Sequence, residues 1–107
     1  MNLWHMQLHP TGATTWTAED TRHIVVTGYI GCSGKIVQTF GKLLVGDLVL
    51  VRYGAQVVAL AAVEDMPHLL QDYEKHPLHW FTHGCRVKPL AYYDDLKIGG
   101  RGWYLPT

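Results

Sequence analysis

The chain has 107 residues, of which 48% are hydrophobic and 17% are charged. This length suffices for one domain with one core, and the composition excludes a disordered chain. Nine Lys and Arg residues balance nine Asp and Glu residues. The chain therefore lacks the net positive charge expected of a protein that binds nucleic acid mainly through its phosphates. We therefore expect a single domain over residues 1–107.

The sequence also bears on the compartment. No apolar run approaches the roughly 20 residues that a membrane helix needs, and no basic region followed by an apolar stretch opens the chain. We therefore expect no membrane association, no signal peptide and a cytoplasmic location. Cys32 and Cys85 are too few for a disulfide scaffold, and we expect both to be free thiols.

The first predicted strand runs from Leu3 to His9, where apolar and polar residues alternate. This alternation predicts that Trp4, Met6 and Leu8 share the face that packs on the core. Pro10 ends the strand.

A helical turn and a second strand are predicted next. Thr17 followed by Asp20 resembles a capping box and predicts a single helical turn after Trp16. The β-branched, apolar run from His23 to Tyr29 is typical of a central strand buried on both faces. The glycines from Gly28 to Gly34 then predict a flexible loop, which is the first candidate for function.

Spacings of three and four between apolar residues predict an amphipathic helix from Lys35 to Val45. Two strongly apolar strands follow, from Asp47 to Tyr53 and from Gln56 to Val63. The two residues between them, Gly54 and Ala55, are typical of a hairpin with a primed turn.

The last third of the chain has a weaker pattern. Residues 67–75 indicate a short helix or a loop, and Cys85 to Tyr93 indicate a strand in which Pro89 favours an edge or a bulge. Residues 103–105 are a candidate last strand. The predicted fold class is α+β, a small twisted mixed β-barrel of five or six strands with one or two flanking helices.

Several segments carry a family resemblance. The segment LWHMQLHP at residues 3–10 resembles the opening Tyr-Trp-Leu-Met-Lys-Ser-Glu-Pro of the EVE domain, a member of the PUA-like superfamily, which also contains the YTH readers. Gly46 and Asp47 before an apolar strand are similar to the family pattern at that point. Residues 83–90 resemble a late strand in EVE-like domains of McrBC-type, modification-dependent restriction proteins, and they retain His83 and Arg86.

The resemblance implies a non-catalytic module that flips a modified base out of DNA, or less favourably RNA, into an aromatic pocket. It would act fused to, or beside, a motor or nuclease, and no cofactor is expected. Tyr29 occupies the place comparable to a cage Trp of the YTH readers, and Trp16 opens a segment similar to the EVE pattern Trp-Ser-Trp-Glu-Asp. The candidate nucleobase-binding residues are Tyr29, Ser33, Trp16, Tyr53 and Trp80, and the candidates for the nucleic-acid backbone are Lys35, Arg52, Arg86 and Lys88.

Each candidate has an alternative role, since Trp and Tyr also pack in the cores of small barrels and Ser33 suits an ordinary turn. The spacing of His76, His79, His83 and Cys85 offers ligands for a metal such as zinc, although it fits no standard finger. No hydrolase, nucleotide-binding or deaminase motif is present, so no enzyme is expected. A small barrel that binds RNA, a protein or a metal remains the alternative.

Overall fold

A computed structural model describes residues 1–10, 15–74, 78 and 81–92. The strands of this part are β1 (Leu3–Gln7), β2 (Tyr29–Cys32), β3 (Leu48–Tyr53), β4 (Gln56–Val63), β5 (His68–Leu69) and β6 (His83–Tyr92). The α-helices are α1 (Ala18–Val26) and α2 (Val37–Phe40), and two 3₁₀ turns are η1 (Gly34–Ile36) and η2 (Asp72–Glu74).

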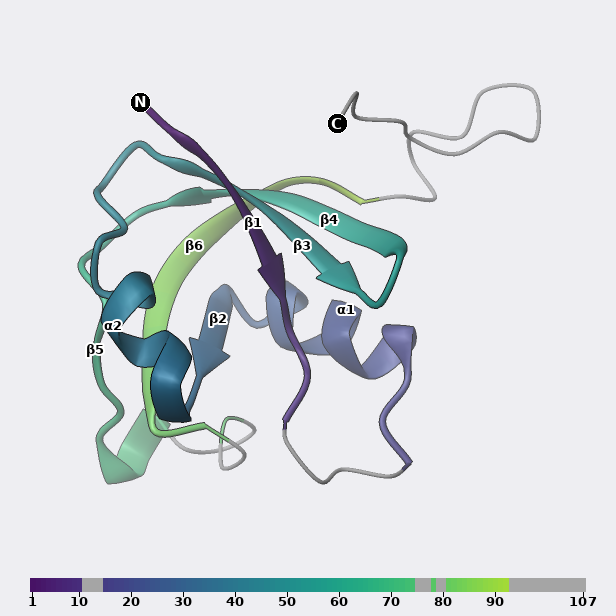
Figure 1. Ribbon diagram of the computed structural model, residues 1–107, viewed down its shortest axis with the longest axis horizontal. Helices are drawn as coiled ribbons and strands as arrows, with labels where there is room; N and C mark the ends of the chain where they lie inside the picture. Colours follow the sequence, from purple (N-terminus) through teal and green to yellow (C-terminus); the bar gives the residue numbers. More distant parts are fainter. Residues whose placement is uncertain (11–14, 75–77, 79–80, 93–107) are drawn as a thin grey trace.

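The strands form one curled, mixed sheet in the order β1-β3-β4-β6-β2, with β5 also paired to β6 (Figure 1). β1 and β3 are parallel, and the other pairs are antiparallel. Within the described residues, the end strands β1 and β2 each pair with one neighbour only, so the sheet is a half-barrel that stays open between them. The predicted α+β class with five or six strands is confirmed in this coarser form.

The predicted first strand is confirmed as β1. Met6 and Leu8 are buried, Trp4 is half-buried against the core, and His5 and Gln7 on the other face are exposed. The alternation thus gave the correct core face, because successive side chains of a strand point to opposite sides.

The predicted hairpin is also confirmed. β3 and β4 pair up to Tyr53 and Gln56 across the two-residue turn Gly54-Ala55. Gly54 has a φ of 59°, a left-handed value that glycine adopts at little cost and that primed turns require. β3 and β4 are inner strands of the sheet, which explains their continuous apolar sequence.

The predicted strand from His23 to Tyr29 is wrong. The capping box is present, since the Asp20 amide donates to Thr17 Oγ1 at 3.3 Å and the Thr17 amide donates to Asp20 Oδ2 at 2.8 Å. The helix that starts there is α1, which runs nine residues instead of one turn. Two β-branched residues of α1, Ile24 and Val25, are buried against the sheet, and this burial outweighs their weak helix preference.

Two further predictions need correction. The predicted loop from Gly28 to Gly34 is mostly β2, which begins after Gly28 with its φ of 87°. The predicted helix from Lys35 to Val45 is shorter, because η1 and α2 together end at Phe40 and Gly41 forms the helix C-cap.

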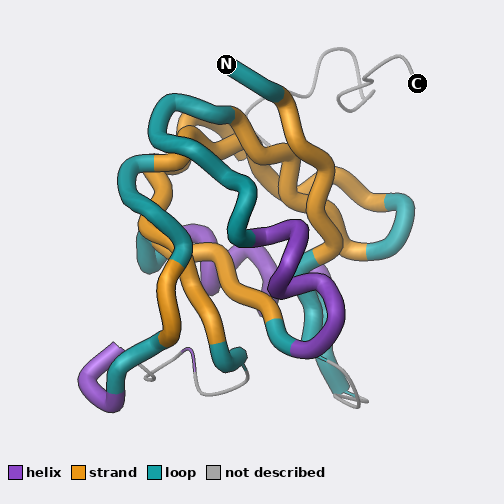
Figure 2. The backbone as a smooth tube through the Cα atoms, turned by 60° about the vertical axis from the view of Figure 1, so that its left-hand side comes forward, coloured by secondary structure: helices purple, strands orange, loops and turns teal. Residues whose placement is uncertain are grey.

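Pro89 lies at a bulge, as predicted. Leu60 pairs with Ala91 and Ala61 pairs with Pro89, so the pairing skips one residue of β6. β6 pairs with β4 through its second half and with β2 and β5 through its first half, and it therefore carries the curl of the sheet (Figure 1). Figure 2 shows the curled strands, in orange, from a second side. The candidate strand at residues 103–105 lies outside the described residues.

Among the described helices, none combines the length and the apolar character needed to cross a membrane.

Candidate functional site

A cavity of about 330 Å³ lies where β1 and β2 end, at the opening of the half-barrel. We call it the edge cavity. The η1 turn contributes to it through Ile36, and the segment before β6 contributes Phe81. The residues that line it are Gln7, His9, Pro10, Gly31, Cys32, Ser33, Ile36 and Phe81.

Polar groups of the edge cavity point to hydrogen bonding with a ligand. Ser33 Oγ accepts a hydrogen bond from the Thr82 amide at 2.9 Å, which leaves the hydroxyl proton available for donation. Gly31 belongs to β2, an end strand of the described sheet, so one edge of its backbone faces away from β6 toward the opening. Backbone and hydroxyl groups on an apolar wall are the usual composition of a small-molecule site.

The apolar wall depends on a close approach between Phe81 and β2. A Cβ atom at Gly31 would lie 2.8 Å from both Cγ and Cδ2 of Phe81, which is inside van der Waals contact. Only glycine therefore lets the aromatic ring rest on the strand. The sequence shows Gly31 as one of several glycines, and nothing in the sequence pairs it with Phe81.

Cys32, in the same cavity, is not activated as a nucleophile. Burial raises the pKa of its thiol to about 11, so the thiol is protonated near neutral pH. Its chemistry at the cavity is that of a small apolar surface.

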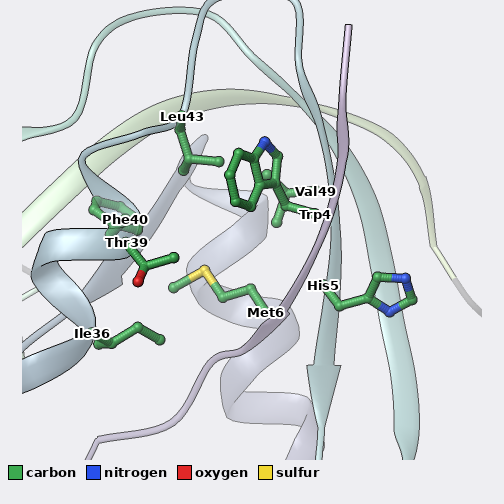
Figure 3. A pocket seen from close by; sticks show the side chains of 8 residues that line it. All are labelled: Trp4, His5, Met6, Ile36, Thr39, Phe40, Leu43 and Val49. Atoms are coloured by element: carbon green, nitrogen blue, oxygen red, sulfur yellow. The ribbon is translucent and has the colours of Figure 1, made fainter.

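A smaller apolar notch of about 50 Å³ lies beside the edge cavity, and the two share Ile36 (Figure 3). Trp4 and Met6 of β1 point into it, toward Phe40 of α2, whereas the His5 ring points away. This volume is far below that of typical ligand sites, so the notch is a packing gap between β1 and α2. The prediction that Trp4 packs toward the core agrees with this placement.

The structure brings Trp16 and Tyr53 together, next to the edge cavity. The Tyr53 hydroxyl donates to the Trp16 carbonyl at 2.8 Å, and Trp16 Nε1 donates to Thr21 Oγ1 at 2.9 Å. The Tyr53 ring meets the His9 ring edge to face, with centroids 6.0 Å apart. Neither aromatic side chain lines the cavity, and His9 connects them to it.

Of the other candidates for base binding, Ser33 lies in the edge cavity and Tyr29 does not line it. The Tyr29 hydroxyl donates to Glu74 Oε2 at 2.9 Å. Burial and this carboxylate both raise the pKa of Tyr29, so the hydroxyl keeps its proton. Trp80 lies outside the described residues.

The four basic candidates are not gathered at one place. Lys35 is exposed on η1, between the cavity residues Ser33 and Ile36. Arg86 and Lys88 are exposed on one face of β6, because residues two apart share a face. Arg52 is half-buried on β3, where its Nη2 donates to the Ala55 carbonyl at 3.4 Å.

The candidate metal cluster is only partly described, since His76 and His79 lie outside the described residues. Cys85 is buried, its thiol donates to the Asp65 carbonyl at 3.2 Å, and burial raises its pKa to about 12. His83 Nδ1 lies 2.9 Å from Thr82 Oγ1. Within the described residues no three His, Cys, Asp or Glu side chains are placed to hold a metal ion.

No family model, curated protein or solved structure matches this chain. We therefore argue function from the residues of the cavity. Sequence reasoning named Ser33 and Lys35 as candidates, but it did not name the cavity residues Gln7 and His9. It missed Phe81, for which the sequence carries no signal.

Proposed function

We propose that the chain is a binding module that takes a modified nucleobase, flipped out of DNA, into the edge cavity. The observation that carries this proposal is the cavity itself. Its volume of about 330 Å³ falls at the lower end of the roughly 300–1,000 Å³ of small-molecule sites, which suits a single flat ring.

The lining supplies the interactions that a flipped base needs. Unstacking a base costs a few kcal/mol, and stacking on an aromatic side chain recovers about 1–3 kcal/mol. Phe81 is the aromatic wall on which the base would stack, while the Ser33 hydroxyl and the Gly31 backbone would face the edge of the base. An added methyl group buried against Ile36 or Pro10 would contribute about 0.8 kcal/mol, which is the basis for preferring a modified base.

The balanced charge of the chain fits a module whose affinity comes from the base more than from the phosphates. Lys35, exposed next to Ser33, is the basic residue best placed to contact a phosphate beside the flipped base. The resemblance to EVE and other PUA-like domains belongs to the same proposal. In this role the chain would be a cytoplasmic specificity module that acts with a motor or nuclease of a restriction or defence system.

The direct test is the binding of short duplex and single-stranded oligonucleotides with N6-methyladenine, 5-methylcytosine or 5-hydroxymethylcytosine, beside unmodified controls. We expect one modification to be preferred. Ser33→Phe, which fills the cavity, should abolish that preference, and Gln38→Phe, which adds the same bulk on exposed α2, should not. A chain that binds none of these oligonucleotides at low salt would contradict the proposal.

A second candidate is binding of an extended peptide. It is favoured by one observation, the position of the cavity between the end strands β1 and β2, because peptides add to strand edges of this kind. Saturable binding of an extended peptide by a chain that binds no oligonucleotide would support this candidate instead.

A further inference from the structure

One segment outside the edge cavity holds its wall in place. We call residues 66–74, which contain β5 and η2, the outer segment. β5 pairs with β6, and the Leu70 amide donates to the Thr82 carbonyl at 2.9 Å. Leu70 packs so closely on Gly84 that a Cβ atom there would lie 2.6 Å from Leu70 Cδ2.

Thr82 connects this segment to the cavity. Its carbonyl accepts from Leu70, and its amide donates to Ser33 Oγ, the hydroxyl that lines the cavity. Phe81, the aromatic wall, precedes Thr82 in the chain. The position of the wall and of the Ser33 hydroxyl therefore depends on how firmly the outer segment is held.

A buried carboxylate fastens the outer segment to the sheet. The Glu74 side chain is only 6% exposed. It accepts hydrogen bonds from the Tyr29 hydroxyl of β2 at 2.9 Å, from the Gln71 amide at 3.1 Å and from His68 Nε2 at 2.9 Å. Two of these donors keep their protons near neutral pH, and His68 is the one that titrates in that range.

The surroundings of the His68 ring require a proton on both nitrogens. Nδ1 lies 3.1 Å from the Met66 carbonyl, and Nε2 lies 2.9 Å from the Glu74 carboxylate. Both oxygens only accept hydrogen bonds, so both contacts are hydrogen bonds only when the imidazole is the doubly protonated cation. The hydrogen bond to Glu74, followed by the one to Met66, accordingly raises the pKa of His68 above its ordinary value of 6.5.

Other charged and titratable groups face this pair. Asp65, just before the outer segment, also raises the pKa of His68. The charge of Arg86 on β6 lowers the pKa of Tyr29, and Tyr73 of η2 raises it. His83 of β6 is a second histidine beside the segment, and its Nδ1 lies 2.9 Å from Thr82 Oγ1. A change between pH 6 and 8 is therefore assigned to His68 by its loss in His68→Gln.

We propose that His68 is a proton-operated clamp on the wall of the edge cavity. Within the outer segment, the doubly protonated ring joins β5 to the Met66 carbonyl and to Glu74, and Glu74 in turn joins the segment to Tyr29 of β2. Loss of one proton breaks one of the two hydrogen bonds of the ring. The outer segment then holds Thr82, Phe81 and Ser33 less firmly. The consequence for ligand binding rests on the proposed function above, whereas the loosening of the segment does not.

The pH window follows from the two pKa shifts. Because the pKa of His68 is raised, its contribution to stability is complete below pH 6.5 and is lost as the pH rises through the folded-state pKa. Because the hydrogen bond from His68 lowers the pKa of Glu74, that contribution is present above pH 4.5 and is lost as the pH falls. The clamp is therefore strongest between about pH 4.5 and 6.5.

The first test uses the protein without any ligand. Hydrogen exchange would give the protection factor of the Leu70 amide at pH 6 and pH 8, corrected for the intrinsic exchange rate. We expect protection to fall about fivefold in the wild type and in His23→Gln, an exposed histidine on α1, and to stay constant in His68→Gln. Equal protection at both pH values in the wild type, or the same fall in His68→Gln, would overturn the proposal.

The second test measures the affinity for the preferred oligonucleotide at the same pH values. We expect about fivefold weaker binding at pH 8 in the wild type and no such change in His68→Gln. His9 also lines the cavity, so His9→Gln serves as the control for direct contact with the ligand. A chain that binds no oligonucleotide contradicts the proposed function, and the exchange result then decides the clamp alone.

Discussion

Two buried carboxylates hold loops onto the sheet of this protein, and they differ in their donors. Asp47, just before β3, accepts hydrogen bonds from the Asn2 amide at 3.0 Å, from Trp4 Nε1 at 2.9 Å and from the Leu44 amide at 3.1 Å. These donors are neutral and never lose their protons near neutral pH. Glu74 is bound by similar neutral donors and, in addition, by the titratable ring of His68.

The difference teaches that one side of the half-barrel is fixed and the other responds to protons. The hydrogen bond from Trp4 is the largest cause that lowers the pKa of Asp47 below its ordinary value of 3.8. The contribution of the Asp47 carboxylate to stability is therefore complete above pH 3.8, and its three donors do not weaken this contribution as the pH rises through neutrality. The contribution of the Glu74–His68 pair also declines above pH 6.5.

The largest effect should come from removing the fixed carboxylate. Asp47→Ala leaves three donors without their acceptor in a site only 3% exposed, so we expect the thermal midpoint to fall by about 10 °C or more. Thermal unfolding followed by circular dichroism would measure it. Glu64→Ala, at an exposed carboxylate, is the control. An unchanged midpoint in Asp47→Ala would show that the three bonds do not hold the N-terminal strand.

The next effect concerns the cavity wall. Gly31→Ala places a Cβ atom 2.8 Å from the Phe81 ring, and relief requires the ring to move. We expect a loss of about 1–3 kcal/mol in the free energy of unfolding, measured by urea denaturation. Gly41→Ala makes only ordinary contacts, the nearest at 3.5 Å, and should be tolerated. Equal stability of the two variants would mean that Phe81 is not packed on β2.

A smaller effect distinguishes the two carboxylates directly. Glu74→Gln keeps a hydrogen-bond acceptor but removes the charge that holds His68 protonated. We expect its thermal midpoint to lie a few degrees below the wild type at pH 6 and to show little decline from pH 6 to pH 8. Asp47→Asn should be destabilised at both pH values while retaining the wild-type decline. The comparison fails if Asp47→Asn loses the decline and Glu74→Gln keeps it.

The smallest effect on folding is expected from Ser33→Ala, a variant that should nevertheless weaken ligand binding. Ser33→Ala removes the cavity hydroxyl, but the Thr82 amide also donates to the Cys32 carbonyl at 3.2 Å, so folding should be preserved. We expect about fivefold weaker oligonucleotide binding, the equivalent of one hydrogen bond, measured by fluorescence anisotropy. Wild-type affinity in this variant would remove Ser33 from the site.

The elements that the sequence predicted correctly are those with a local cause. β1 follows from alternation, and the β3–β4 hairpin follows from two apolar runs around Gly54. The run from His23 to Tyr29 misled because its composition favours a strand, whereas the capping box at Thr17 starts a helix that continues into the run as far as Val26. A local start signal was stronger here than residue preference.

The candidate site was harder to predict, because its contacts join distant parts of the chain. Phe81 and Gly31 are far apart in sequence, and their contact depends on the pairing of β2 with β6. Tyr29 and Glu74 are separated by 45 residues, so an expected cage residue proved to be a donor to a buried carboxylate. Ser33, which the sequence offered because it stands in a glycine-rich segment, lies at the cavity, and its role in binding stays a prediction.

The central claim is that the edge cavity holds the ligand, and chemical-shift mapping tests it most directly. The isotope-labelled chain would be titrated with the oligonucleotide that carries the preferred modified base. We predict that the largest amide shifts occur at Gly31, Cys32, Ser33 and Ile36, which line the cavity. Shifts concentrated at Arg86 and Lys88 on β6, with the cavity amides unchanged, would contradict the account.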